Sequence, residues 1–143
     1  MYIHRQLEPK FLKMSAFFKA VLVTGARQVG KTTMLKHLSE NRTYVSLDDV
    51  DTLTLAKEDA KLFFMRYKPP IIIDEVQKAP ELFPYIKILC DESDDTGLFW
   101  LTGSEQFSMM KNVTESLAGR IGIMSLYPLS MSEINNVVFD APL

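Results

Sequence analysis

The sequence predicts an α/β fold in which about five parallel strands form a doubly wound sheet flanked by helices. Short apolar, β-branched segments alternate along the chain with segments whose apolar residues recur at helical spacing. The run Ile71-Ile72-Ile73 has no polar face, which is typical of a strand buried on both sides in a parallel sheet. A glycine-rich segment follows the first strand and precedes a helix. Strands that alternate with helices favour crossover connections and therefore a parallel sheet.

The expected elements follow one another in alternation. Strands are expected at residues 20–24, 43–47, 71–73, 97–102 and 121–126. Helices are expected at about residues 7–18, 32–38, 50–67 and 105–117, with another that begins near Pro80 or Pro84 and runs to about Cys90. Pro69 and Pro70 end the helix over 50–67, because proline blocks helix continuation.

Residues 25 to 33 form a complete phosphate-binding loop of the form G-x-x-x-x-G-K-[ST]. In this motif, backbone N–H groups cradle the phosphates, the lysine (Lys31) reaches the β and γ oxygens, and the hydroxyl of Thr32 ligates Mg²⁺. The strand before the loop and the helix after it supply the context that the motif requires. The predicted nucleotide-binding residues are Gly25, Ala26, Arg27, Gln28, Val29, Gly30, Lys31, Thr32 and Thr33.

Two adjacent carboxylates, Asp74 and Glu75, directly follow the buried strand at 71–73. Such a strand, known as a Walker B element, delivers its aspartate to the carboxyl edge of the sheet, where it holds Mg²⁺. The glutamate is then placed to orient and polarise an attacking water. A surface acidic pair after a core strand is the alternative, and the complete phosphate-binding loop upstream favours the Walker B interpretation.

The adjacent glutamate also separates classes of nucleotide-binding enzyme. Ras-like GTPases read guanine with an Asn/Thr-Lys-x-Asp element, and this tetrapeptide does not occur in the sequence. Small-molecule P-loop kinases generally lack the second carboxylate, and nothing here resembles an acceptor pocket. The sequence therefore favours an ATPase that has an extra strand, residues 97–102, between its two Walker strands.

The segment after this extra strand offers candidates for a residue that senses the γ-phosphate. Ser104 is the first choice, Thr102 the second and Gln106 a distant third. Alternatively, Ser104 caps the helix that follows, since serine is a favoured N-cap residue. The two roles are compatible with each other.

Arg120 follows the helix over 105–117 and comes directly after Gly119, a plausible C′ residue. An arginine at this position can be an ordinary partner of the helix dipole. It can equally reach the γ-phosphate on a neighbouring subunit as an arginine finger. Spacing alone leaves both roles open.

Five segments together resemble a prokaryotic family of AAA-type P-loop ATPases: GARQVGKTT, IIIDEVQKAPELF, LTGSEQF, ESLAGRIGI and LYPLSMSEI. The resemblance runs from residue 1 to about residue 134, and residues 74–78 and 126–130 make it far more specific than a phosphate-binding loop alone. It implies ATP binding by residues 25–33, Mg²⁺ at Thr32 and Asp74, Glu75 as the catalytic base, and Arg120 as the finger.

The sequence departs from this family in two ways. Ala26 stands where the family usually has proline, which leaves the loop less stiff without loss of a contact. The chain also stops at Leu143, before the helical lid and the C-terminal domain that is often likened to restriction-type nucleases. We therefore expect one ATPase core over residues 1–143, with an N-terminal helical segment at 1–19 and the truncated start of a C-terminal region at 127–143. The missing lid is expected to expose apolar surface that favours self-association.

The composition agrees with a single soluble domain that works in a reducing compartment. The chain has 143 residues, of which 47% are hydrophobic and 24% charged, with a formal net charge of −2. No basic block is present to bind a nucleic-acid backbone strongly. The lone cysteine, Cys90, excludes an intrachain disulfide and favours the cytoplasm. No apolar stretch approaches the length of a membrane span.

These observations lead to two functional hypotheses. The first is the ATP-binding core of an AAA-type ATPase that hydrolyses ATP to ADP and phosphate with Mg²⁺ and thereby drives a conformational change. The alternative is a nucleotide-dependent switch or interaction module with little turnover, in which ATP orders the surface near residues 104–120 for a partner.

Overall fold

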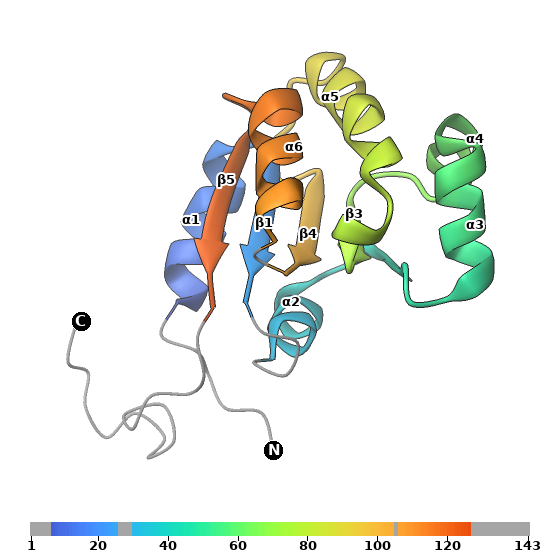
Figure 1. The fold of residues 1–143 in the computed structure, drawn as a ribbon. Coiled ribbons are helices and arrows are strands. Elements are labelled where there is room, and N and C mark those ends of the chain that lie inside the picture. The colour runs from blue at the N-terminus through green and yellow to red at the C-terminus, as the bar shows by residue number, and fades with distance from the viewer. Residues whose placement is uncertain (1–6, 26–29, 105, 127–143) are drawn as a thin grey trace.

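A computed structural model describes residues 7–25, 30–104 and 106–126 of the chain. They form a five-stranded sheet with helices on both faces (Figure 1). The strands are β1 (Ala20–Thr24), β2 (Thr43–Ser46), β3 (Ile71–Asp74), β4 (Phe99–Gly103) and β5 (Ile121–Ser125). The α-helices are α1 (Glu8–Phe17), α2 (Lys31–Leu38), α3 (Val50–Glu58), α4 (Ala60–Arg66), α5 (Phe83–Asp91) and α6 (Phe107–Leu117). Two short 3₁₀ turns, η1 (Val76–Lys78) and η2 (Pro80–Leu82), lie between β3 and α5.

All neighbouring strands pair in parallel, in the order β2-β3-β4-β1-β5. The central strand β4 places Leu101 beside Leu22 of β1 and beside Ile73 of β3. The prediction of an extra strand between the two Walker strands is thus confirmed. Because every strand runs in the same direction, the ends of β1, β3 and β4 meet at one carboxyl edge, where their polar residues become neighbours.

Two apolar layers cover the sheet, which is therefore doubly wound as predicted. On one face, alternate strand residues pack against α1 and α2 through Phe11, Met34 and Leu35. On the other face, the remaining strand residues pack against α3, α4, α5 and α6. Alternation of side chains across the strands explains why one β-branched run can serve both layers. Within the described part of the chain, no helix has the length and apolar character needed to cross a bilayer.

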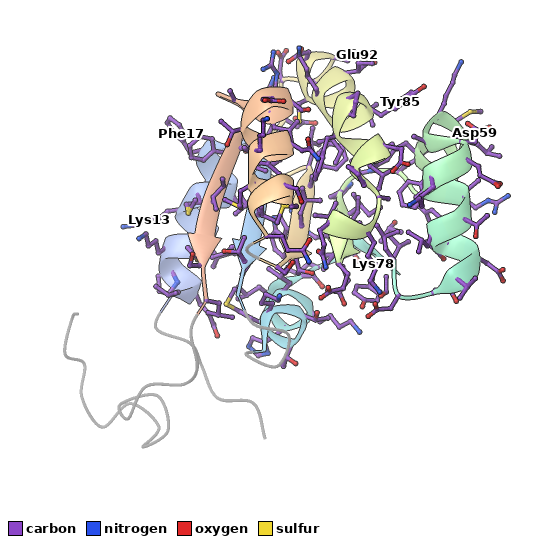
Figure 2. All side chains as sticks on the ribbon, viewed as in Figure 1. Lys13, Phe17, Asp59, Lys78, Tyr85 and Glu92 are labelled. Carbon is purple, nitrogen blue, oxygen red and sulfur yellow. The ribbon has the colours of Figure 1, made fainter. Side chains whose placement is uncertain are left out.

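One expected helix differs in its continuity from the sequence-based expectation. The single helix expected over 50–67 is instead two helices, α3 and α4, that meet at Asp59 (Figure 2). The Asp59 carboxylate accepts a hydrogen bond from the backbone N–H of Leu62 at 3.0 Å and caps α4. Aspartate side chains compete with the helix for backbone donors, and this local bond interrupts an otherwise continuous apolar stripe. Helix α5 begins at Phe83, next to the expected start at Pro84, and α6 begins at Phe107, two residues after its approximate expected start.

The loop before β4 makes a close approach to α1 that requires glycine. Gly97 has φ +65°, and its N–H donates to the carbonyl of Phe18 at 2.9 Å. A Cβ at this position would lie 2.6 Å from the Ser15 hydroxyl oxygen and 3.1 Å from the Ser15 carbonyl oxygen.

The guanidinium of Arg42 stacks 3.6 Å from the centre of the Trp100 ring and donates to the Gly97 carbonyl at 2.5 Å. Burial lowers the pKa of Arg42 to about 10.

This geometry predicts that Gly97→Ala destabilises the fold more than Gly119→Ala does. Both glycines have positive φ, but a Cβ at Gly119 would meet nothing within 4 Å. Gly119→Ala should therefore cost only the backbone strain of about 1–2 kcal/mol, while Gly97→Ala should cost a further 1–3 kcal/mol or so because of overpacking. Urea unfolding of both variants measures the difference, and equal losses would contradict a tight contact at Gly97.

Candidate functional site

The carboxyl edge of the sheet gathers most of the residues that the sequence singled out. The phosphate-binding loop leaves β1 at Gly25, and α2 begins with Lys31 and Thr32 next to the ends of β1 and β4 (Figure 1). Asp74 ends β3 and Glu75 follows it. Thr102 and Ser104 lie at and just beyond the end of β4. The predicted residues Ala26, Arg27, Gln28 and Val29 lie outside the described part of the chain.

Two motif glycines adopt backbone conformations that suit glycine. Gly30, the N-cap of α2, has φ +88° in the left-handed region, and Gly25 has φ +147°. Glycine enters these regions without the clash that a Cβ would cause. At Gly30 the left-handed backbone leads straight into α2, whose first residues are Lys31 and Thr32. Thr33, also predicted to bind nucleotide, is exposed on the first turn of the helix.

The Lys31 side chain is buried, with only 3% of the residue exposed. Its ammonium donates to the carbonyl of Gly25 at 2.8 Å and to the carbonyl of Gly103 at 3.1 Å. A buried cation needs hydrogen-bond acceptors, and here both are neutral carbonyls. An anion at this edge would be a stronger partner, because two opposite charges attract more strongly than a charge and a neutral carbonyl where water is largely excluded.

Three hydroxyl groups hold the Asp74 carboxylate. Thr32 donates to its Oδ1 at 2.9 Å, Tyr44 donates to its Oδ2 at 2.8 Å, and Thr102 also donates to Oδ1. Asp74 is 8% exposed, so these bonds replace the water that it would otherwise bind. Burial, together with the bond to Asp74, raises the pKa of Tyr44 to about 12. The phenol therefore stays protonated and remains a donor.

Tyr44 was not among the residues that the sequence singled out. It lies on β2, which pairs with β3 so that Tyr44 is opposite Ile72 and Ser46 is opposite Asp74. Residue spacing does not determine which strand borders β3, so the place of a hydroxyl group on that neighbouring strand could not be predicted. Given the strand order, Tyr44 could have been recognised from the sequence as a tyrosine in a strand that neighbours the Walker B strand.

Glu75 adopts the left-handed backbone conformation with φ +61° and ψ +49°. Its N–H donates to the Thr102 hydroxyl oxygen at 2.9 Å, and its Oε2 accepts a hydrogen bond from the Gln77 amide at 2.7 Å. Left-handed backbone at a residue other than glycine costs about 1–3 kcal/mol and persists only where the surroundings enforce it. Such strain is typical of functional sites, and here it falls on the predicted catalytic base.

The two sensor candidates differ in how their hydroxyl groups are used. Thr102 is fully buried, and its hydroxyl donates to Asp74 while it accepts from the N–H of Glu75. The Ser104 Oγ is also buried and has no hydrogen-bond partner in the described part of the chain. Helix α6 begins at Phe107 with Gln106 as its N-cap and no side-chain cap bond. Ser104 therefore does not cap α6, and its hydroxyl remains available to a ligand.

The oxygen donors at this edge fit Mg²⁺. Thr32 and Asp74 place a hydroxyl and a carboxylate oxygen 2.9 Å apart. The Thr32 hydroxyl donates its proton to Asp74 and so keeps its lone pairs for a cation. Among the residues that the structure describes, no group of three or more His, Cys, Asp or Glu side chains could hold a metal. A site with two protein oxygens suits Mg²⁺, which usually retains several waters and binds substrate phosphates.

Arg120 does not lie with the other predicted residues. It directly precedes β5, and its carbonyl accepts from the N–H of Ala20 at the start of β1, on the amino edge of the sheet. One strand length, about 15 Å, separates this edge from the loop. The guanidinium donates from Nε and Nη2 to Asp91 at 2.6 and 3.2 Å, and from Nη1 to the carbonyl of Ala118 at 3.0 Å. The bond from Arg120 lowers the pKa of Asp91.

The contacts of Thr102 predict a clear difference between two substitutions. Thr102→Val should lower the free energy of unfolding by about 3 kcal/mol, because it leaves the Glu75 N–H without an acceptor and removes a donor to a carboxylate. Thr102→Ser retains the hydroxyl and should lose only about 1 kcal/mol for the deleted methyl group. Urea denaturation of both variants tests this ranking, and a valine variant as stable as the serine variant would contradict it.

The structure is similar in fold to two solved structures. It matches Saccharomyces cerevisiae RIF2 with a TM-score of 0.53 at 12% identity, over 92% of this chain and 58% of that one. It also matches Hsp104 in a closed state with ATPγS and FITC-casein, with a TM-score of 0.53 at 16% identity, over 93% of this chain and 31% of that one. At these identities the likeness concerns the fold alone.

Sequence comparison gives relatives that are themselves uncharacterized. Uncharacterized protein Mb2031c of Mycobacterium bovis and uncharacterized protein Rv2008c of Mycobacterium tuberculosis are each 32% identical over 123 residues. The match spans 84% of this chain and 27% of each relative, so the chain corresponds to about a quarter of their length. A family model described as an AAA domain matches residues 17–135. Since this match spans most of the chain and includes the whole sheet, the chain belongs to the AAA domain family.

Proposed function

We propose that this AAA module hydrolyses ATP to ADP and phosphate in the presence of Mg²⁺. The observation that carries the proposal is the arrangement around Thr102, where one hydroxyl holds both Asp74 and the backbone of Glu75 next to Lys31 and Thr32. Membership of the AAA family supports nucleotide binding. The adjacent aspartate and glutamate add the two carboxylates that metal-assisted hydrolysis of a phosphoanhydride needs.

Lys31 is proposed to bind the β- and γ-phosphates of ATP. Its ammonium already lies between the start of the loop and the end of β4, and its acceptors among the described residues are carbonyl oxygens. Phosphate oxygens would replace these acceptors with charged ones and so offset the cost of burying the cation. Because this interaction forms in the ground state, its loss should weaken binding itself.

Thr32 and Asp74 are the residues that would hold Mg²⁺, which supplies positive charge to the phosphate oxygens. Tyr44 and Thr102 orient the Asp74 carboxylate through their hydroxyl groups. Glu75 is proposed to act as the general base that orients and deprotonates the attacking water. The unpartnered Ser104 hydroxyl is our candidate for contact with the γ-phosphate or that water.

Arg120 is proposed to act on the nucleotide of a neighbouring subunit. Its place on the amino edge, with the strand length between it and the loop, is incompatible with contact to the nucleotide of its own chain. An arginine finger supplied in trans would make turnover depend on association. The same observation favours the second candidate function, in which the isolated chain binds nucleotide as a switch and turns over slowly.

We further propose a reducing compartment and self-association for this protein. Cys90 is fully buried, and burial raises the pKa of its thiol to about 11, which suits a structural thiol in a reducing cytoplasm. We propose self-association of AAA modules rather than strong nucleic-acid binding, given the net charge of −2. The family resemblance further leads us to propose a nuclease-like C-terminal domain in the longer relatives.

Lys31→Ala is expected to weaken MgATP binding by about 10- to 100-fold, because a charged hydrogen bond contributes about 1.5–3 kcal/mol. Isothermal titration calorimetry on the parent chain and the variant measures the change. Lys57→Ala, on the exposed side of α3, removes the same charge away from the site and should bind as the parent does. Unchanged affinity in folded Lys31→Ala would show that this loop is not the nucleotide site.

Glu75→Gln is expected to retain MgATP binding and to lose turnover by about 100-fold or more, since a positioned general base contributes that much. Phosphate release, measured over a range of protein concentrations, tests this, with Glu81→Gln as the control for the change in charge.

A rate per chain that rises with concentration would support the finger in trans. Turnover by Glu75→Gln at the parent rate would disprove the assignment of the base, and a parent with binding but no turnover would favour the switch.

A further inference from the structure

Gln77 contacts the proposed general base, although the motif that contains it indicated no role for this residue. It lies in the turn η1, and its side-chain Nε2 donates to Glu75 Oε2 at 2.7 Å. Its Oε1 is buried and has no hydrogen-bond partner in the described residues. A Cβ at Gly103 would come within 3.0 Å of that oxygen, so the bare backbone at Gly103 leaves room for the amide. Gln77 therefore lies between the base and the end of β4.

The main chain holds Gln77 in this place. The N–H of Lys78 donates to the carbonyl of Glu75 at 3.1 Å, and the N–H of Ala79 donates to the carbonyl of Val76 at 3.1 Å. Val76 is fully buried between the two polar residues and anchors the turn in the core. Together with the left-handed backbone of Glu75, this short turn directs both side chains toward each other. The contact thus follows from backbone geometry and not from a chance meeting of surface groups.

An amide is chemically suited to orient a carboxylate that must accept a proton. A glutamate side chain has three rotatable bonds, and fixing it in one orientation costs conformational entropy. The amide donor binds one carboxylate oxygen and adds no charge, so the negative charge and the second oxygen remain for water. A lysine or arginine at this place would instead neutralise the carboxylate.

We propose that Gln77 is a positioning residue that holds the Glu75 carboxylate in the orientation required for attack by water. The proposal rests on the proposed function of Glu75 as general base. Misplacement of a reacting group by about 1 Å can cost about 100-fold in rate. Loss of the amide should therefore lower kcat, while the KM for ATP, which depends on the loop and Lys31, should stay the same.

The first test is ATP turnover by Gln77→Met, which retains the length of the side chain and removes the donor. A fall in kcat of about 10- to 100-fold with unchanged KM is expected. Lys78→Met is the matched control, because Lys78 (labelled in Figure 2) belongs to the same turn and pairs instead with Asp48. It should turn over ATP at the parent rate. Turnover by Gln77→Met at the parent rate or faster would overturn the proposal.

A double-mutant cycle shows whether Gln77 acts through Glu75. In the Glu75→Gln background, Gln77→Met should produce no further loss of the residual rate, because the group that Gln77 orients is already gone. An equal fractional loss in both backgrounds would show that Gln77 acts independently of the base and would overturn the proposal.

A measurement without nucleotide separates failure of this inference from failure of the proposed function. The NMR signal of the Gln77 side-chain amide should exchange slowly with water in the parent, and it should shift and exchange faster in Glu75→Met, which keeps the length of the side chain and removes the acceptor oxygen. An unchanged signal would disprove the contact itself. If the signal changes while the parent never turns over ATP, the contact stands and the hydrolytic function, with the catalytic role of Gln77, is disproved.

Discussion

The site depends on one buried hydroxyl group, that of Thr102. It donates to the carboxylate of Asp74 and accepts from the N–H of Glu75, and so fixes the two acidic residues relative to β4. This is possible because β4 lies between the strand that carries the loop and the strand that carries the carboxylates. The hydroxyl also supplies an acceptor for the backbone of a strained residue, which helps to stabilise the left-handed conformation of Glu75.

Polar groups that are costly for stability gather at the same edge of the sheet. Lys31 is buried against neutral carbonyls and Glu75 is strained. The Ser104 hydroxyl and the Gln77 carbonyl oxygen are buried and have no partner among the described residues. In the apolar layers on the two faces, by contrast, side chains from the strands and helices form continuous clusters. Buried polar groups that lack hydrogen-bond partners are expected to gather where a ligand binds and supplies those partners. At the amino edge, Arg120 is paired twice to Asp91, and one buried atom among the described residues, Nη1 of Arg42, has no partner.

Features that depend on short stretches of sequence could be predicted. The five strands and the carboxylate pair at the end of β3 follow from local hydrophobic runs and residue spacing. The place of β4 followed from the adjacent glutamate at position 75, which indicated an ATPase with an extra strand. The boundary between α3 and α4 could not be predicted, because the capping bond of Asp59 outweighed a continuous apolar stripe. The boundaries of helices depend on such single bonds and not on periodicity.

By itself, the sequence determined the fold class and the chemical types that meet at the carboxyl edge, since parallel strands bring their ends together whatever lies between them. Only the tertiary structure decided which partners each group has. Tyr44 reaches Asp74 because β2 borders β3, and Gln77 reaches Glu75 because the backbone at Glu75 turns into the left-handed region. Arg120 lies on the opposite edge because its residue precedes a strand instead of following one. Contacts of this kind depend on strand order and backbone dihedral angles, and residue spacing along the chain does not encode them.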